Sequence, residues 1–315
     1  MTGLSVLPAL IAGEPSTLFG RLRPDAGVPV LAPAAAEPDR WFDDGAAIQR
    51  HGCVRFVVEG DWLFGCAEAD DGAGIQTAAQ QAYADLFRVV GAGAHPHLLR
   101  LWNYFSGINA DGGGAERYRQ FNAGRQQAFI EARRSAFEGA PAACALGTPG
   151  GPLRVYFLAG RTPPRAIENP RQVSAYHYPN AYGPRSPSFS RAALVDVGGG
   201  REALFISGTA SIVGHVTMHA GDVARQTEET LCNLAAVRAV AAERAGVAFP
   251  ADELVYTVYL RRAADLAPVR TIFEAAVGPA SRSAREAIYL QADICRADLL
   301  VEIEAHGFAR SERRA

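Results

Sequence analysis

The residues with the clearest potential for chemistry lie in the second half of the chain, between Tyr176 and Glu304. A loop rich in Tyr, Arg and Ser (YHYPNAYGPRSPSFSRAAL) comes first, a strand ending in Ser-Gly-Thr follows, and the segment LLVEIEA closes the region. The planar guanidinium of arginine matches a carboxylate with two parallel hydrogen bonds. This combination therefore predicts a pocket for a small anion, with one carboxyl group at its wall.

Glu302 is the candidate for that carboxyl group. In LLVEIEA a period of two places Glu302 and Glu304 on one face of a strand, together with Leu300, and the remaining apolar residues on the other. The simplest alternative is that both glutamates face water on a half-exposed strand. A carboxyl group in a partly apolar pocket has a raised pKa, so it can deliver a proton at neutral pH.

The candidates for binding the anion offer a guanidinium, a phenol or a backbone group at a strand end. They are Arg171, Tyr176, Tyr178, Tyr182, Arg185 and Arg191 around the central loop, Gly208 and Thr209 at the strand end, and Arg125 in the first half. For any single arginine, a solvated surface charge is the alternative. Interleaved Arg and Tyr also suit RNA, but 31 basic against 33 acidic residues give a formal charge of −2, which predicts no nucleic-acid partner.

Nothing in the sequence indicates a metal or a cofactor. The five cysteines are widely spread without a CxxC pair, which argues against a disulfide framework or a zinc cluster. His215 and His219 are four residues apart but lack a third ligand of clear spacing. No GxGxxG follows a strand, and P-loop and GxSxG motifs are absent. Without a secretory signal or an apolar run of about 20 residues, we expect a cytoplasmic protein with no membrane partner.

The elements that must position these residues form two similar halves. Residues 1 to about 50 read as an irregular lead-in with one or two strands. The first half then predicts a hairpin in RFVVEGDWLFGCAEA, a helix from Thr77 to Val90, a strand in HLLRLWNYF, a helix in AERYRQFNAGRQQAFIEARR and a strand in PLRVYFLAG. The same order recurs in REALFISGTAS, a helix from Asp222 to Arg244, DELVYTVYLRR, DLAPVRTIFEAA and DLLVEIEAHG. Chance similarity is the alternative, but this order favours a duplicated α+β domain.

Several of these segments resemble known families. FISGTAS, VYLRRAADLAPVRTIFEA and LLVEIEA resemble the RidA (YjgF) family, whose small domain packs two helices on a mixed β-sheet. RLWNYFSGIN, ERYRQFNAGRQQAF, AYHYPNAYGPRSPSFSRA and SGTASIVGH, from both halves, resemble the chorismatases, which split pyruvate from chorismate. The resemblance implies two tandem RidA-like domains, divided at the Pro-rich segment 161–175 into residues 1–160 and 161–315.

The resemblance also implies roles for individual residues. Glu302 matches the catalytic glutamate of the family, and Tyr156 stands at the matching place in the first half, which would leave residues 1–160 without a catalytic Glu. The arginines and tyrosines would hold the two carboxylates of chorismate. Cys295 is by itself most simply a small buried residue. In chorismatases a Cys there accompanies 3-hydroxybenzoate as product, whereas an Ala accompanies hydrolysis to 3,4-dihydroxycyclohexa-1,5-dienoate. A subgroup that makes both 3- and 4-hydroxybenzoate stays open.

Two other functions compete with this interpretation. A RidA-type imine deaminase would share the fold, but the Arg-Ser-Cys signature of RidA proteins is replaced here by SAREAIYL. A non-catalytic sensor of an aromatic acid would use the same cleft without chemistry. RidA proteins form trimers, whereas a duplicated chain can satisfy its own interfaces, so we expect a monomer or a homotrimer.

Overall fold

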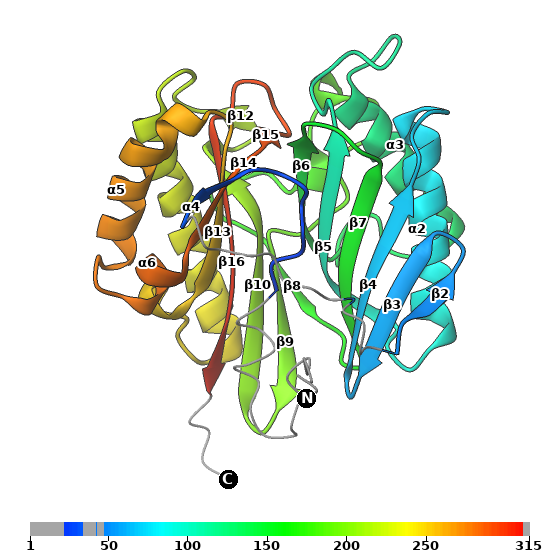
Figure 1. Cartoon of the computed structure of the whole chain (residues 1–315). Coiled ribbons are helices and arrows are strands. Elements are labelled where there is room, and N and C mark those ends of the chain that lie inside the picture. Colours follow the sequence, from blue (N-terminus) through cyan, green and yellow to red (C-terminus); the bar gives the residue numbers. More distant parts are fainter. Residues whose placement is uncertain (1–21, 34–41, 43–46, 311–315) are drawn as a thin grey trace, which may run out of the picture.

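Two β-sheets lie side by side at the centre of the molecule, and helices cover the outer face of each (Figure 1). The structure is a computed structural model that describes residues 22–33, 42 and 47–310. Each sheet has seven strands and mixes one parallel pair with antiparallel neighbours. The predicted α+β fold, with two mixed sheets each packed by helices, is confirmed.

The first half of the chain builds the sheet with strand order β15-β6-β5-β7-β4-β3-β2. Its own elements are β2 (Gln49–His51), β3 (Val54–Glu59), β4 (Trp62–Ala69), α2 (Ile75–Ala92), β5 (His97–Ser106), α3 (Arg117–Glu131), β6 (Ala142–Thr148) and β7 (Leu153–Gly160). The predicted hairpin is β3–β4. The two predicted helices are α2 and α3, which pack on each other and on one face of this sheet (Figure 1).

The second half repeats this arrangement with strand order β1-β14-β13-β16-β10-β9-β8. Its elements are β8 (Arg165–Ile167), the 3₁₀ turns η1 (Ala175–His177) and η2 (Asn180–Tyr182), β9 (Ala192–Gly198), β10 (Arg201–Ala210), β11 (Ile212–Val213), β12 (Val216–Thr217), α4 (Val223–Ala245), η3 (Ala251–Glu253), β13 (Val255–Leu260), η4 (Ala263–Asp265), α5 (Leu266–Val277), α6 (Arg282–Glu286), β14 (Ile288–Gln291) and β16 (Val301–Arg310). Helix α4 begins where the Asp222 side chain accepts the backbone N–H of Arg225 and ends at Gly246, whose φ of 70° suits a glycine.

The structure contains strands that were not predicted, of which β6 in the first half and β14 in the second belong to the repeated core, whereas β8, β11 and β12 are short additions to the second half. Strands β6 and β14 each pair in parallel with the strand that precedes them in the sheet, β5 or β13, after a helical crossover. Strand β6 is built from small residues (AACALGT), so it lacks the β-branched signal of a typical strand. Small side chains are needed there because β6 packs closely on β10 of the other sheet.

The two sheets exchange short strands at their ends. Strand β1 (Val30–Ala32), from the predicted lead-in, pairs with β14 of the second-half sheet. Strand β15 (Asp293–Ile294), from the end of the chain, pairs with β6 of the first-half sheet. The division of the chain at residues 160 and 161 therefore stays a prediction, and it applies to the two hydrophobic cores rather than to every strand. Residues 1–21, 34–41 and 43–46 of the predicted lead-in lie outside the described residues.

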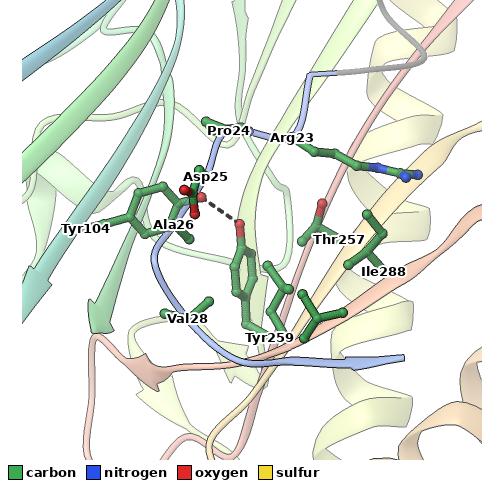
Figure 2. A pocket seen from close by; sticks show the side chains of 11 residues that line it. Arg23, Pro24, Asp25, Ala26, Val28, Tyr104, Thr257, Tyr259 and Ile288 are labelled. Atoms are coloured by element: carbon green, nitrogen blue, oxygen red, sulfur yellow. Dashed lines mark hydrogen bonds between the residues drawn. The ribbon is translucent and has the colours of Figure 1, made fainter. Parts of the chain in front are cut away.

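Polar groups as well as apolar ones fill the space between the sheets. Tyr104 of β5 and Tyr259 of β13 meet there, with their hydroxyl oxygens 2.9 Å apart (Figure 2). They border a cavity of about 110 Å³, which residues 23–30 cover from the other side (Figure 2). The two halves thus share a buried interior in which hydrogen-bonding side chains are brought together.

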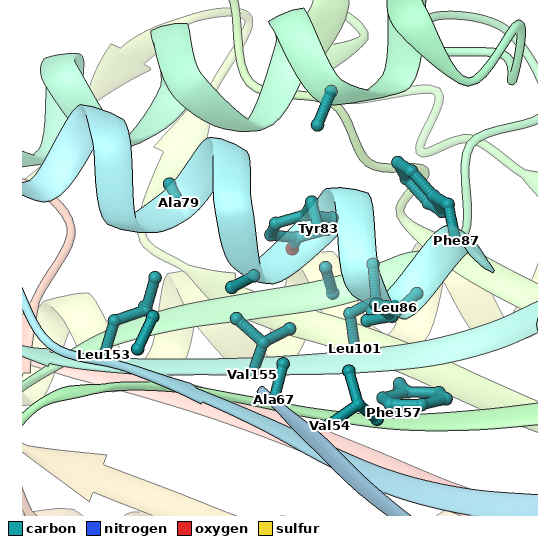
Figure 3. Close-up of a cluster of buried hydrophobic side chains, with 14 of the residues drawn as sticks. Val54, Ala67, Ala79, Tyr83, Leu86, Phe87, Leu101, Leu153, Val155 and Phe157 are labelled. Atoms are coloured by element: carbon teal, nitrogen blue, oxygen red, sulfur yellow. The ribbon is translucent and has the colours of Figure 1, made fainter. Parts of the chain in front are cut away.

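Each sheet also packs against its own helices through an apolar core. In the first half, Tyr83 and Leu86 of α2 face Leu101, Val155 and Phe157 of the sheet (Figure 3). In the second half, α4 and α5 cover β13, β16 and β10 in the same way. Burial of each large apolar side chain stabilises the fold by about 1.5–3 kcal/mol, so both faces of the central strands are fixed by packing.

No helix among the described residues is long and apolar enough to cross a membrane.

Candidate active site

A pocket of about 440 Å³ lies between the central loop, the ends of β10 and β16 and the start of α3. Six of the residues predicted from the sequence line it: Tyr178, Tyr182, Arg191, Gly208, Cys295 and Glu302. They come from segments more than 100 residues apart in the chain. The folding of the second half therefore brings the predicted acid, the thiol and part of the Arg-Tyr loop to one cavity.

Glu302 is buried at the wall of this pocket, with 3% of its surface exposed. Strand β16 lies inside its sheet between β13 and β10, with helices on one side and the other sheet opposite. Both faces of the strand are therefore covered, and Glu304 is 5% exposed. The alternative that the two glutamates face water is wrong.

Burial sets the protonation of Glu302. Loss of hydration raises the pKa of its carboxyl group to about 8, the charge of Glu304 adds to this rise, and Arg100 opposes it. At neutral pH the folded protein therefore holds Glu302 mainly in its protonated form. A protonated carboxyl group that borders a cavity can act as a general acid.

Gly208 explains how the carboxyl group is kept in place. A Cβ at this position would lie 1.9 Å from Oε1 of Glu302 and 2.9 Å from Cβ of Cys144. Only a glycine leaves room for the carboxyl group on this side. The sequence singled out Gly208 as a strand-end backbone contact, and the structure adds this steric reason.

Cys295 places a thiol beside the acid. Its Sγ lies 4.0 Å from Oε2 of Glu302. Burial, and then the charge of Glu302, raise the pKa of this thiol to about 12, so it is neutral at physiological pH. Cys295 can therefore fill space and donate a weak hydrogen bond, but it does not supply a thiolate.

Arg191 is the predicted arginine that reaches the pocket. Its Nη2 donates to the Tyr178 hydroxyl and to the carbonyl of Val173, both at 2.8 Å, and its guanidinium stacks on Phe189. These contacts hold the charged group in one orientation at the wall. The arrangement suits a carboxylate held through a fixed arginine and a neighbouring phenol.

Arg296 is a pocket residue that sequence reasoning missed. Its guanidinium lies 4.1 Å from the ring centre of Tyr182 and 5.1 Å from that of Tyr178, and its Nη1 donates to the carbonyl of His215 at 2.9 Å. Its Nη2 has no hydrogen-bond partner among the described residues. The available signal was its position directly after Cys295.

The first half contributes to the same pocket through the start of α3. Glu116, Tyr118 and Arg119 line it opposite the central loop. Burial raises the pKa of Tyr118 far above that of a free phenol, and the Cys295 thiol adds to the rise, so the hydroxyl stays protonated. The site therefore needs both halves of the chain, which the repeat pattern alone did not reveal.

The remaining predicted residues do not line the pocket. Arg171 instead forms an ion pair with Glu229 at 2.6 Å and donates to Asn233. Arg185 is exposed and donates to the side chain of Gln126 at 3.1 Å.

Arg125 and Thr209 are turned into the protein. Arg125 is buried on α3, donates to the Asn122 side chain at 2.9 Å and stacks on Phe121. The Thr209 hydroxyl donates to the carbonyl of Ser207 at 2.8 Å, so the threonine completes the strand end. Tyr176, which stacks on its neighbour in η1, is likewise absent from the pocket lining.

The two histidines considered as metal ligands have different partners. His215 faces the Tyr182 ring, whereas His219 lies 3.6 Å from Glu229. Within residues 22–33, 42 and 47–310, no group of three or more His, Cys, Asp and Glu side chains could hold a metal ion.

Comparison with known proteins identifies the family. A family model described as "Chorismatase FkbO/Hyg5-like, N-terminal" matches residues 39–159. A chorismatase from Streptomyces rapamycinicus is 41% identical over 279 residues, which cover 84% of this chain and 80% of that protein. The chain belongs to the chorismatase family.

Further members of the chorismatase family match over most of the chain. A 3-hydroxybenzoate synthase from Streptomyces hygroscopicus is 38% identical over 89% of this chain and 84% of its own length. A crystal structure of a chorismatase superposes with a TM-score of 0.76 and 37% identity, covering 82% of this chain and 78% of that one. The chorismatase fold thus extends over both halves of the chain.

Proposed function

We propose that the protein is an enzyme that converts chorismate to 3-hydroxybenzoate and pyruvate. The observation that carries the proposal is Glu302, a buried carboxyl group with a pKa raised to about 8, at the wall of a pocket that also holds arginines. The names of its relatives, chorismatase and 3-hydroxybenzoate synthase, support the same reaction.

The first step is proton transfer from Glu302 to the methylene carbon of the enolpyruvyl group. A C–H bond forms, and the electron pair of the double bond is used for it. The adjacent carbon becomes an oxocarbenium ion. The bond between the ether oxygen and the ring then breaks with its electron pair going to oxygen, so pyruvate leaves with that oxygen and the ring keeps the positive charge. The hydroxyl oxygen of the neighbouring ring carbon moves to the cationic carbon, and the ring loses one proton to the Glu302 carboxylate, which gives 3-hydroxybenzoate and restores the acid. General acid catalysis of this type contributes roughly 10²–10⁴-fold to the rate. The two products together have the composition of chorismate, so this route consumes no water.

Cys295 supports 3-hydroxybenzoate as the product over the alternative, hydrolysis to 3,4-dihydroxycyclohexa-1,5-dienoate. Hydrolysis adds one water, and that water needs space beside the reacting centre. The neutral thiol of Cys295 occupies space 4.0 Å from the acid. A smaller residue there would leave room for water. Formation of some 4-hydroxybenzoate beside 3-hydroxybenzoate is also compatible with this route.

The substrate carries two carboxylates, and the pocket offers two arginines suited to them. Arg191 is fixed by Tyr178, and Arg296 is stacked on Tyr182 and has a buried amino group without a hydrogen-bond partner among the described residues. We propose that each holds one carboxylate, with the tyrosines as neighbouring donors and walls. Arg171, Arg185 and Arg125 have other partners and are left out of this role.

The test is incubation of the purified protein with chorismate, with pyruvate measured by a coupled assay and the ring product identified by chromatography and mass. We expect equal amounts of pyruvate and 3-hydroxybenzoate. Pyruvate with the dienoate would support the hydrolytic alternative. Chorismate binding without pyruvate would support a non-catalytic sensor and would overturn the proposal.

We also keep as proposals the division of the chain at residues 160 and 161 and a monomer or homotrimer as the assembly. Sedimentation of the purified protein distinguishes the two assemblies.

A further inference from the structure

A second buried carboxyl group lies beside the acid. Glu304 follows Glu302 by two residues on β16, so both side chains point to the same face, toward the first-half sheet. Two residues along a strand are about 6.6 Å apart, and both side chains are more than nine-tenths buried. The proposed reaction uses Glu302 and assigns no task to Glu304.

Glu304 is surrounded by hydrogen-bond donors from both halves. Its carboxylate forms an ion pair with Arg100 and accepts Nε1–H of Trp102 at 3.1 Å and the hydroxyl of Tyr259 at 3.1 Å. Tyr259 in turn meets Tyr104 at the cavity between the sheets (Figure 2). Three donors, one of them charged, stabilise the ionised form of a carboxyl group. The Glu304 carboxylate is therefore held by donors from both halves in the buried interface.

The other titratable groups that face Glu302 are neutral at physiological pH. They are Cys295 in the loop before β16, Cys144 on β6, Tyr118 on α3 and Tyr259 on β13. Burial raises the pKa of each of these thiols and phenols well above its ordinary value. The other charged residues that line the pocket are Glu116, Arg119, Arg191, Arg296 and Asp298. The charges that act most strongly on Glu302 are those of Glu304, which raises its pKa, and Arg100, which lowers it.

We propose that Glu304 is a positioning residue that keeps the proton on Glu302, and that Arg100 and Trp102 of the first half hold it in place for this task. The negative charge of Glu304 disfavours a second negative charge on Glu302. Arg100 lowers the pKa of Glu302, but this effect is smaller than the rise that Glu304 causes. The inference rests on the proposed role of Glu302 as acid. It gives the first-half sheet a part in catalysis without a contact to substrate.

The first test is the pH profile of kcat/KM in a Glu304→Gln variant. Two charges about 7 Å apart at an effective dielectric constant of about 20 shift a pKa by roughly 1.7 units. We expect the alkaline limb of the profile to move to lower pH by at least about one unit, because the proton leaves Glu302 more easily. A merely structural role would lower kcat/KM at every pH and leave the limb in place.

The Arg100→Met/Glu304→Gln double variant is a control for misfolding, because Glu304→Gln alone leaves the Arg100 charge buried without its partner. Its alkaline limb should also move to lower pH, but by less, because both opposing charges are removed. Glu202→Gln is the matched control. Glu202 is 8% exposed, pairs with Arg165 at 2.6 Å and lies at the far end of the neighbouring strand β10. Its removal should leave the limb unchanged.

The deciding measurement titrates Glu302 directly and needs no turnover. The infrared band of protonated carboxyl groups is followed with pH in the wild type, in Glu304→Gln and in the double variant, each against a matching variant with Glu302→Gln. The proposal predicts loss of the Glu302 proton at lower pH in both. An unchanged Glu302 titration in both variants would overturn it. If the shift occurs but the wild type releases no pyruvate from chorismate, the proposed function fails and the link between the two carboxyl groups stands.

Discussion

Replacing Gly208 with alanine tests whether the acid must stay where the structure has it. The added Cβ would lie 1.9 Å from Oε1 and 2.8 Å from Cδ of Glu302. On its other side it would lie 2.9 Å from Cβ of Cys144, which is buried in the sheet interface and cannot yield. The carboxyl group therefore has to swing away by about 1 Å or more, and a displacement of that size costs about 100-fold in rate.

The variant should still fold, because Gly208 does not require a left-handed backbone. Overpacking of this kind typically lowers the free energy of unfolding by about 1–3 kcal/mol. We therefore expect kcat for pyruvate release to fall by about 100-fold, with a much smaller change in KM. Circular dichroism and thermal unfolding check that the fold is intact.

Gly150→Ala serves as the control, because a Cβ there meets no atom within 4 Å. It should keep wild-type kcat and stability. If Gly208→Ala is folded and keeps kcat within about threefold of the wild type, the position of the Glu302 carboxyl group does not limit the chemistry. That result would refute the steric argument and weaken the role of Glu302.

Four further variants test the same site. Cys295→Ala should keep pyruvate release and shift the ring product from 3-hydroxybenzoate toward the dienoate, as chromatography of the products would show; an unchanged product would rule out steering by the thiol. Glu302→Gln should be more stable than the wild type at pH 8, by on the order of 3 kcal/mol in denaturant unfolding. The folded-state pKa of about 8 lies above the ordinary 4.5, so between these values the unfolded state releases a proton that the folded state keeps, and wild-type stability falls as pH rises. Equal slopes of stability against pH in the two proteins would contradict this. Arg171→Ala should lower the free energy of unfolding by about 1 kcal/mol and leave KM unchanged. Arg296→Ala should raise KM by about tenfold or more. A raised KM in Arg171→Ala together with an unchanged KM in Arg296→Ala would return Arg171 to the binding site.

Periodicity was enough to predict the elements with strong local patterns. The hairpin β3–β4 alternates, and α2 and α4 carry apolar stripes with clear ends, so their positions follow from local sequence. Strand β6 was missed because its residues are small, as close packing against the opposite sheet requires, and so lack the pattern of a typical strand. Strand β14 has only four residues and follows a short helix, which leaves too little pattern to detect.

The same limit applies to the site. Glu302, Cys295 and Arg191 could be predicted because they lie in segments that resemble a known family. Arg171 carries the same residue type in the same loop, yet Glu229 on α4 captures it. Whether an arginine of the loop faces the pocket depends on a partner far away in sequence.

The contribution of the first half was also hidden from local reasoning. In the sequence, Arg100 and Trp102 look like ordinary residues of a buried strand. Their contacts with Glu304 become visible only when β5 faces β16 across the interface. Arg296 is fixed by two tyrosine rings more than 100 residues earlier in the chain. Contacts between sheets have no period in the sequence, so only the assembled structure reveals them.

The most direct test of the central claim measures pyruvate release by Glu302→Gln at pH 7 under single-turnover conditions, with chorismate binding followed by calorimetry. Glutamine keeps the shape of the side chain but cannot deliver the proton. The account predicts a rate at least about 100-fold below the wild type, with chorismate affinity within about threefold. Pyruvate release within about tenfold of the wild-type rate would show that another group protonates the substrate.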